Sequence, residues 1–222
     1  MTSIQMKAEC YKVSAVVLAK GHNPTILHPY FLKNEGIVPR EWQPSKPPVC
    51  TPPFASVSFT SGFSFVVEQE RMVVSFNGEK AEDRAEAMAA MARKYVEKLP
   101  YVPYSAVGIN FDAFCLLSEP SSFIIQRFIK EGPWNSTELP LSAAKQNFTY
   151  NCAEYQLNIS LEPGKRKSQE NQSEQDGIVF HANYHGQCPE DSSLDSVVAL
   201  LEQAEQRKEH FKNISGLLLG EK

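Results

Sequence analysis

Residues 55–76 read ASVSFTSGFSFVVEQERMVVSF, and this stretch decides the fold class. Its apolar side chains recur at every second position, as in Ala55, Val57 and Phe59, with serine or threonine between them. A period of two is typical of a β-strand that buries one face and exposes the other. The stretch therefore predicts antiparallel strands with one dry side.

Two reversals divide this stretch. Ser61-Gly62 favours a tight turn, although one long strand bent at the glycine would also fit. A two-residue loop at Gln69-Glu70 would place Glu68 opposite Arg71 and keep the large apolar side chains of both strands on one face. We therefore expect a hairpin at 69–70.

An amphipathic helix is predicted next, opening at Asn77-Gly78 and ending near Leu99, because apolar residues then recur every three or four positions. The same order recurs over 146–219, where alternating strands precede a long helix that begins around Ser192. We interpret 54–99 and 146–219 as pseudo-repeats of topology. The expected fold is α+β: an antiparallel sheet from two strand-strand-strand-helix pseudo-repeats, with the two long amphipathic helices packed on one face. The other face would be open to solvent or to a partner.

We expect one α+β domain over 1–222. Its parts are an N-terminal strand and short helix (1–38), a Pro-rich strap (39–53), a first pseudo-repeat (54–116), and a second (117–222) with a mobile loop at 163–176. The strap holds six of the fifteen prolines, which excludes a helix or a central strand. It is either a rigid connector or a docking segment.

Composition narrows the function classes. The net charge is −4, and the basic run at 165–167 is followed at once by acidic residues, so nucleic acid is a disfavoured partner. RNA binding on the sheet ranks last, because the aromatic side chains point to the core. The five cysteines are widely spaced, and we identify no leader in the sequence, so free thiols in the cytoplasm are expected. No apolar segment is long enough to span a membrane, so no membrane association is expected.

The densest polar constellation is FHANYHGQC at 180–188. His181, His185 and Cys188 invite a metal-site interpretation. On a strand, however, the two histidines lie about 13 Å apart, too far to share one ion. We therefore predict no metal ion and no cofactor.

A polar patch is the stronger interpretation. His181, Asn183 and His185 alternate with buried positions, and Asn110 and Asp112 do the same on another predicted strand. If the two strands are neighbours, Asp112 could orient His181 or His185 in an acid–base pair. The alternative is that these side chains only form the wet face of a half-exposed sheet.

Two short runs carry a resemblance: Gly108-Ile109-Asn110-Phe111 at the end of a strand, and Phe180-His181-Ala182-Asn183-Tyr184. In their order with the hairpins and helices, residues 54–219 resemble sporadically distributed bacterial proteins of uncharacterised function. The resemblance is one of pattern, includes no diagnostic motif, excludes the strap and implies no activity.

No nucleophile elbow, phosphate-binding glycine loop or zinc-protease motif is present in the sequence. We therefore expect a non-catalytic protein-interaction or accessory subunit of a bacterial multi-component system, binding a protein partner or forming a homo-oligomer. Asn110, Asn183, Trp42 and Trp134 are the expected binding residues. The tryptophans are included because aromatic residues in loops anchor interfaces; the alternative is that either tryptophan only plugs the edge of the core. The alternative is a small-ligand-binding protein or hydrolase that uses His181 or His185 with Asp112.

Overall fold

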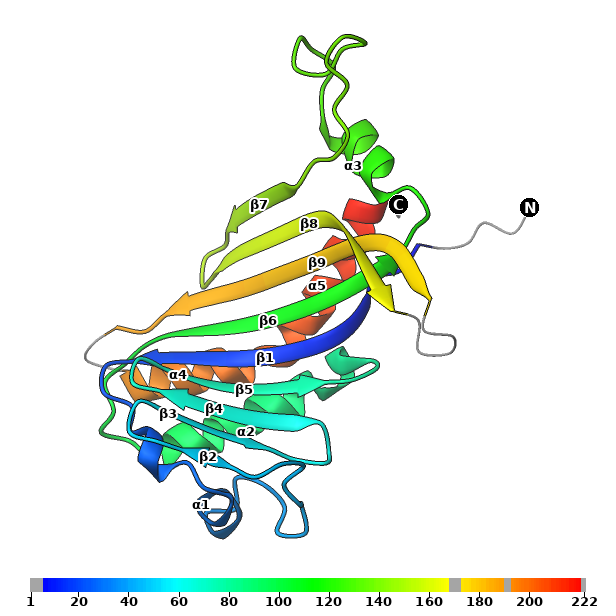
Figure 1. Cartoon of the computed structure of the whole chain (residues 1–222). Coiled ribbons are helices and arrows are strands. Elements are labelled where there is room, and N and C mark those ends of the chain that lie inside the picture. Colours follow the sequence, from blue (N-terminus) through cyan, green and yellow to red (C-terminus); the bar gives the residue numbers. More distant parts are fainter. Residues whose placement is uncertain (1–5, 168–172, 190–192, 221–222) are drawn as a thin grey trace.

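Nine antiparallel strands form one open sheet in the order β2-β3-β4-β5-β1-β6-β9-β8-β7 (Figure 1). The structure is a computed structural model that describes residues 6–167, 173–189 and 193–220. The strands are β1 (Glu9–Ala19), β2 (Val49–Cys50), β3 (Phe54–Ser58), β4 (Phe63–Glu68), β5 (Arg71–Asn77), β6 (Tyr104–Leu116), β7 (Gln146–Asn151), β8 (Gln156–Lys167) and β9 (Glu174–Gln187).

The two halves of the sheet have the same order. In one half β1 is innermost and the meander β5-β4-β3 extends outward from it; in the other, β6 is innermost and β9-β8-β7 extends outward. The halves join where β1 pairs with β6, with Val13 opposite Phe111 and Ala15 opposite Ile109. Each meander is followed in the chain by helix.

The predicted reversals are confirmed. Gly62, with a φ of +88°, makes the turn between β3 and β4, a conformation that favours glycine. The β4–β5 turn sets Arg71 against Glu68 in an ion pair of 2.6 Å, at the predicted register. A hairpin also joins β7 to β8, where the amide of Cys152 donates to the carbonyl of Tyr155 at 2.9 Å.

The helices pack on one face of the sheet. They are α1 (Pro29–Asn34), α2 (Ala85–Glu97), α3 (Pro120–Phe128), α4 (Ser193–Glu202) and α5 (Ala204–Leu219), with the 3₁₀ turns η1 (Pro24–Ile26) and η2 (Ala81–Arg84). α2 lies along β1 and β5, and α4 lies along β6 and α2. No helix in the described ranges covers the opposite face (Figure 1), and none combines the length and apolar character needed to cross a bilayer.

Aromatic stacking joins the centre of the sheet to α5. The ring of Phe111 on β6 stacks on Phe211 at a centroid distance of 5.0 Å, and its edge meets Tyr184 of β9 at 5.9 Å. Both phenylalanines are fully buried. Burying one such side chain contributes about 1.5–3 kcal/mol, so this cluster fixes which face of the sheet is dry.

Three expectations about elements need correction. The C-terminal helix is broken at Gln203, whose ψ of 2° leaves the helical range; α4 precedes this break and α5 follows it, and both contact α2 and β6. The helix predicted to open at Asn77-Gly78 and end near Leu99 begins instead with the separate turn η2, and α2 ends at Glu97. Within the predicted mobile loop, 163–167 and 174–176 are paired strand, tied by the ion pair of Lys165 and Glu174 at 3.1 Å. The polar composition of these residues indicates that their side chains are exposed to water. It does not indicate that their backbone is unpaired. The rest of that loop, 168–172, lies outside the described residues.

His22 is a buried histidine that follows β1. It is 3% exposed, its Nε2 lies 3.2 Å from the carbonyl oxygen of Val17, and its ring faces Tyr104. Burial lowers the pKa of His22, because an imidazolium would lose its hydration there. Hydrogen bonding to the Val17 carbonyl opposes this effect but does not outweigh it.

His22 predicts a pH dependence of stability. Between the lowered folded pKa and the unfolded value of about 6.5, the unfolded chain binds a proton that the folded chain does not. The free energy of unfolding should therefore fall as the pH is lowered through this window, and fall less in His22→Gln. Urea unfolding between pH 7.5 and 5 measures both profiles. Burial also lowers the pKa of His210, but this residue is present in both proteins. Parallel profiles would contradict the assignment to His22.

Candidate functional site

A row of short polar side chains crosses the helix-free face, and we call it the polar row. Each member is directly opposite the next on the neighbouring strand: Ser58, Ser64, Ser75, Ser14, Asn110, Asn183, Asn158 and Thr149, from β3 to β7. Its seven spacings of about 4.8 Å give a length of about 34 Å. The first four members come from one half of the sheet and the last four from the other. One half thus supplies hydroxyls and the other mainly amides.

Hydrogen bonds connect neighbours along the polar row. The amide of Asn183 donates to Oδ1 of Asn110 at 2.5 Å, and Nδ2 of Asn110 donates to Oγ of Ser14 at 3.2 Å. Towards β7, Thr149 Oγ1 donates to Oδ1 of Asn158 at 2.8 Å. An asparagine amide has two N–H donors and two carbonyl lone pairs, so each amide retains capacity to bind a partner outside the row.

A second line of side chains, the charged row, runs beside the polar row. Lys12 lies opposite Asp112, which lies opposite His181. The row also includes the adjoining pair of Lys145 and Glu162, although Ser160 is the residue of β8 directly opposite His181. The distances are 3.5 Å from Lys12 Nζ to Asp112 Oδ2, 2.8 Å from His181 Nδ1 to Asp112 Oδ1, and 2.9 Å from Lys145 Nζ to Glu162 Oε2. The two lysines balance the two carboxylates, so the charged row carries little net charge.

The structure brings His181 and Asp112 together and separates His185 from both. His185 lies opposite Gly108 and Gln156. His181 has a carboxylate at each ring nitrogen, since its Nε2 lies 3.7 Å from Glu162 Oε1. A general base needs one ring nitrogen directed at its substrate. The present geometry therefore fits an ion-pair network better than an acid–base pair.

The metal interpretation of His181, His185 and Cys188 finds no geometric support. Within the part of the chain that the structure describes, no three His, Cys, Asp or Glu side chains are grouped as metal ligands. Burial also raises the pKa of the Cys188 thiol to about 11. Thiolate is the form that binds metal, so this cysteine is a poor ligand.

The two tryptophans differ in their surroundings. Trp42 is half-buried, and its ring stacks on Phe63 at 5.2 Å and contacts Phe59 at 5.4 Å. It holds the strap to the end of β3 and β4 and is not a free anchor. Trp134 is 57% exposed, and its Nε1 donates to the carbonyl of Lys130. Of the two, only Trp134 is placed to contact a partner.

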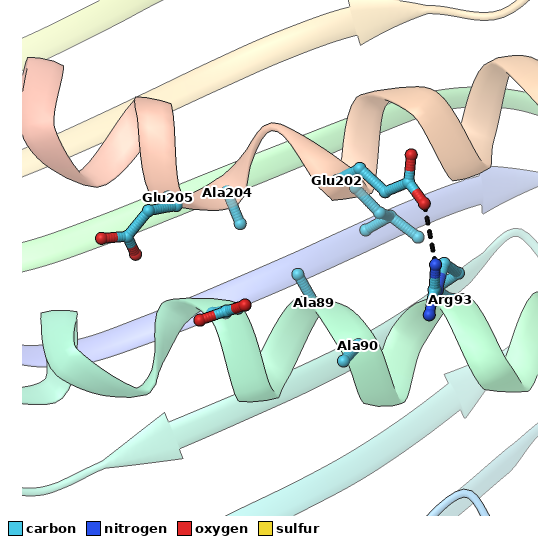
Figure 2. Close-up of a pocket in the computed structure, with 8 residues that line it drawn as sticks. Ala89, Ala90, Arg93, Glu202, Ala204 and Glu205 are labelled. Atoms are coloured by element: carbon cyan, nitrogen blue, oxygen red, sulfur yellow. Dashed lines mark hydrogen bonds and ion pairs between the residues drawn. The ribbon is translucent and has the colours of Figure 1, made fainter.

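Two described cavities lie at α2 on the helix side and contain no residue of either row. One of about 170 Å³ separates α2 from α4 and α5, and Figure 2 shows alanines and carboxylates around it, with Arg93 paired to Glu202 at 2.7 Å. A wider groove of about 510 Å³ separates α2 from the chain after α1. Arg93 is paired with Glu202, so the first cavity offers no free cation, and its other charged lining residues are the carboxylates Glu86 and Glu205.

Sequence reasoning missed most of the polar row and a second polar cluster under the helices. In that cluster the guanidinium of Arg207 lies 3.6 Å over the ring of Tyr155, and Tyr184 is hydrogen-bonded to His210 at 3.1 Å. Arg207 is only 7% exposed and also bonds Gln203. This cluster fixes α5 to β9 and the β7–β8 hairpin. No protein-family model and no curated protein sequence matches the chain.

The pairing of Asp112 with His181 can be measured by a double-mutant cycle. We expect a coupling free energy of roughly 1 kcal/mol between Asp112→Ala and His181→Ala, because the pair is close but partly exposed to water. The cycle of Asp112→Ala with His185→Ala is the control and should be additive. Urea unfolding gives all the free energies. Equal coupling in the two cycles would contradict the described charged row.

Proposed function

We propose that this protein is a non-catalytic binding protein that takes a protein partner on the helix-free face of its sheet. The polar row carries the proposal, because it places hydrogen-bonding side chains on eight neighbouring strands. Ser14 and Ser75 are buried, and the other six members are half-buried or exposed. The bacterial proteins that residues 54–219 resemble in pattern suggest no activity for this chain. We therefore propose that it acts as an accessory subunit of a multi-component system.

The extent of the face favours a protein over a small molecule. Small ligands bind in concave pockets, and the described cavities at α2 lie on the other side of the sheet. A protein interface covers about 800 Å² on each partner. A row about 34 Å long lies within such an area.

The composition of the face also resembles an interface. Beside the polar row, Val66, Val73 and Val16 lie opposite one another on β4, β5 and β1 and are half-buried. An apolar centre with polar surroundings is typical of protein interfaces. The balanced charged row argues against a polyanion such as nucleic acid, which needs a basic surface.

A bulky cation on the polar row should block the partner. We expect Asn183→Arg and Asn158→Arg to weaken binding at least about tenfold, equivalent to roughly 1.4 kcal/mol. Gln206→Arg, on the exposed side of α5, is the matched control and should bind normally. Proteins captured from the native host by each purified variant are compared quantitatively, and the recovered partner is then titrated. Circular dichroism and melting confirm that the variants fold.

The result that would remove the proposal is specific. If every captured protein binds Asn183→Arg, Asn158→Arg and the control equally well, the helix-free face is not the binding surface.

A second candidate function is a hydrolase that uses His181 as general base and Asp112 as its orienting carboxylate. The hydrogen bond of 2.8 Å between them supports it. It ranks second, because Glu162 lies at the other ring nitrogen.

Activity assays distinguish the two functions. General-base catalysis contributes about 10²–10⁴-fold to a rate, so a hydrolase of this kind should lose at least a hundredfold on His181→Ala. We expect no hydrolysis of a panel of activated carboxylic and phosphate esters that depends on His181. Turnover abolished by His181→Ala and by Asp112→Asn, but unchanged in His185→Ala, would favour the hydrolase.

A further inference from the structure

The two edges of the sheet are protected differently. Unpaired backbone groups on an edge strand can pair with another chain, and proteins block them with prolines, charges or bulges. At the β2 edge, the proline-rich chain of the strap lies beside β3: the amide of Ser45 donates to the carbonyl of Ser58, and the amide of Thr60 to that of Gln43. The strand β2 itself has two residues and lies between prolines. This edge is blocked.

The β7 edge has none of these protections. Its residues QNFTYN include no proline and no charged side chain, and the pairing with β8 runs without a register shift. Asn147, Thr149 and Asn151 are exposed. β7 forms the outer margin of the sheet (Figure 1).

The hairpin identifies the backbone groups that point outward. The amide of Cys152 donates to the carbonyl of Tyr155, so these residues occupy a hydrogen-bonded position, and such positions alternate along an antiparallel ladder. Tyr150 and Phe148 therefore use their amides and carbonyls toward β8. Those of Asn147, Thr149 and Asn151 point away from the sheet, and no backbone bond joins them to another element in the described ranges.

This edge is complementary to itself. Two copies that pair antiparallel along β7 are related by a two-fold axis perpendicular to the sheet. Residues paired across the two strands point to the same face, so their numbers differ by an even number. The axis must therefore pass through a residue position and not between two residues. With the axis at Thr149, Thr149 pairs with Thr149 of the partner subunit, and Asn147 with Asn151 of the partner subunit. All three outward-facing residues then exchange amide and carbonyl bonds. Because Thr149 is the last member of the polar row, the row would continue into the second copy.

An arm that is mainly polar but carries two exposed apolar side chains projects past the same edge. The chain between α3 and β7, residues 129–145, extends beyond β7 (Figure 1). It carries Trp134 and Leu139, which are 57% and 61% exposed. These two side chains give a second copy apolar surface to contact beside the strand edge. A second copy added at β7 lies on the side to which this arm extends.

We propose that two copies of this chain associate by antiparallel pairing of their β7 strands about a two-fold axis at Thr149, with each 129–145 arm against the other copy. The partner at this edge is a second copy, because the edge matches itself in backbone pattern, side-chain faces and absence of charge. This interface is separate from the helix-free face, which stays open in the dimer.

The first test removes one outward donor. Wild-type protein should have twice the mass of the 24.9 kDa chain in light scattering and sedimentation at micromolar concentration. Thr149→Pro removes an amide that points away from β8, so we expect a folded monomer, with dissociation at least about a hundredfold easier. Thr149→Val keeps the amide and should remain a dimer. Asn183→Arg should also remain a dimer, which separates this interface from the proposed function.

The second test reads the register with disulfides, in a background where the exposed Cys50 and Cys152 are replaced by serine. Residues in a hydrogen-bonded antiparallel pair have Cα atoms about 5.5 Å apart, a spacing that a disulfide spans. Thr149→Cys should therefore cross-link to itself under mild oxidation. Asn147→Cys should not, because its two copies would lie about 13 Å apart. A mixture of Asn147→Cys with Asn151→Cys should cross-link.

A wild-type chain that stays monomeric up to about 100 µM overturns the proposal, since a dimer with a Kd below that value is worth more than about 5 kcal/mol. So does a dimer that Thr149→Pro leaves intact, or one in which Asn147→Cys cross-links to itself and Thr149→Cys does not.

Discussion

The pairing of β1 with β6 is the constraint on which the rest of the structure depends. It joins a five-stranded half, β2 to β1, to a four-stranded half, β6 to β7, and its register, with Val13 opposite Phe111 and Ser14 opposite Asn110, sets the faces of both. A slip of one residue would turn Ser14 toward the helices and Val13 toward water. The stacking of Phe111 on Phe211 holds this register, because it exists only when Phe111 is on the helix side.

The register of β1 with β6 therefore determines which side chains lie on each face of the sheet. All described helices gather on the dry face, where aromatic rings and the Arg207–Tyr155 contact fix them. The opposite face carries the side chains at the alternate positions of each strand. Serine, asparagine and threonine occur at matching positions in both halves, so a single row crosses the sheet. The same geometry places the two carboxylates of the charged row around His181.

Much of this could be predicted from the sequence, because alternation reports which face each side chain occupies. The strands, the hairpin at 69–70, and the outward direction of His181 and Asp112 follow from it. Alternation does not report which strands are neighbours. That β1 lies between β5 and β6 depends on packing, and the polar row depends on seven registers at once. The break at Gln203 was hidden because the apolar positions of α4 and α5 continue with helical spacing across it.

The central position of β1 also bears on how the chain reaches its fold. β1 ends at Ala19, whereas its partner β6 begins at Tyr104, and closing so long a loop slows folding. During synthesis, which proceeds at about 5–20 residues per second, the first half leaves the ribosome with one long edge of β1 unpaired for several seconds. In the nascent chain, β1 is therefore an exposed edge strand, although it is central in the finished sheet. Until β6 is synthesised, pairing of β1 with a neighbouring nascent chain competes with its native pairing.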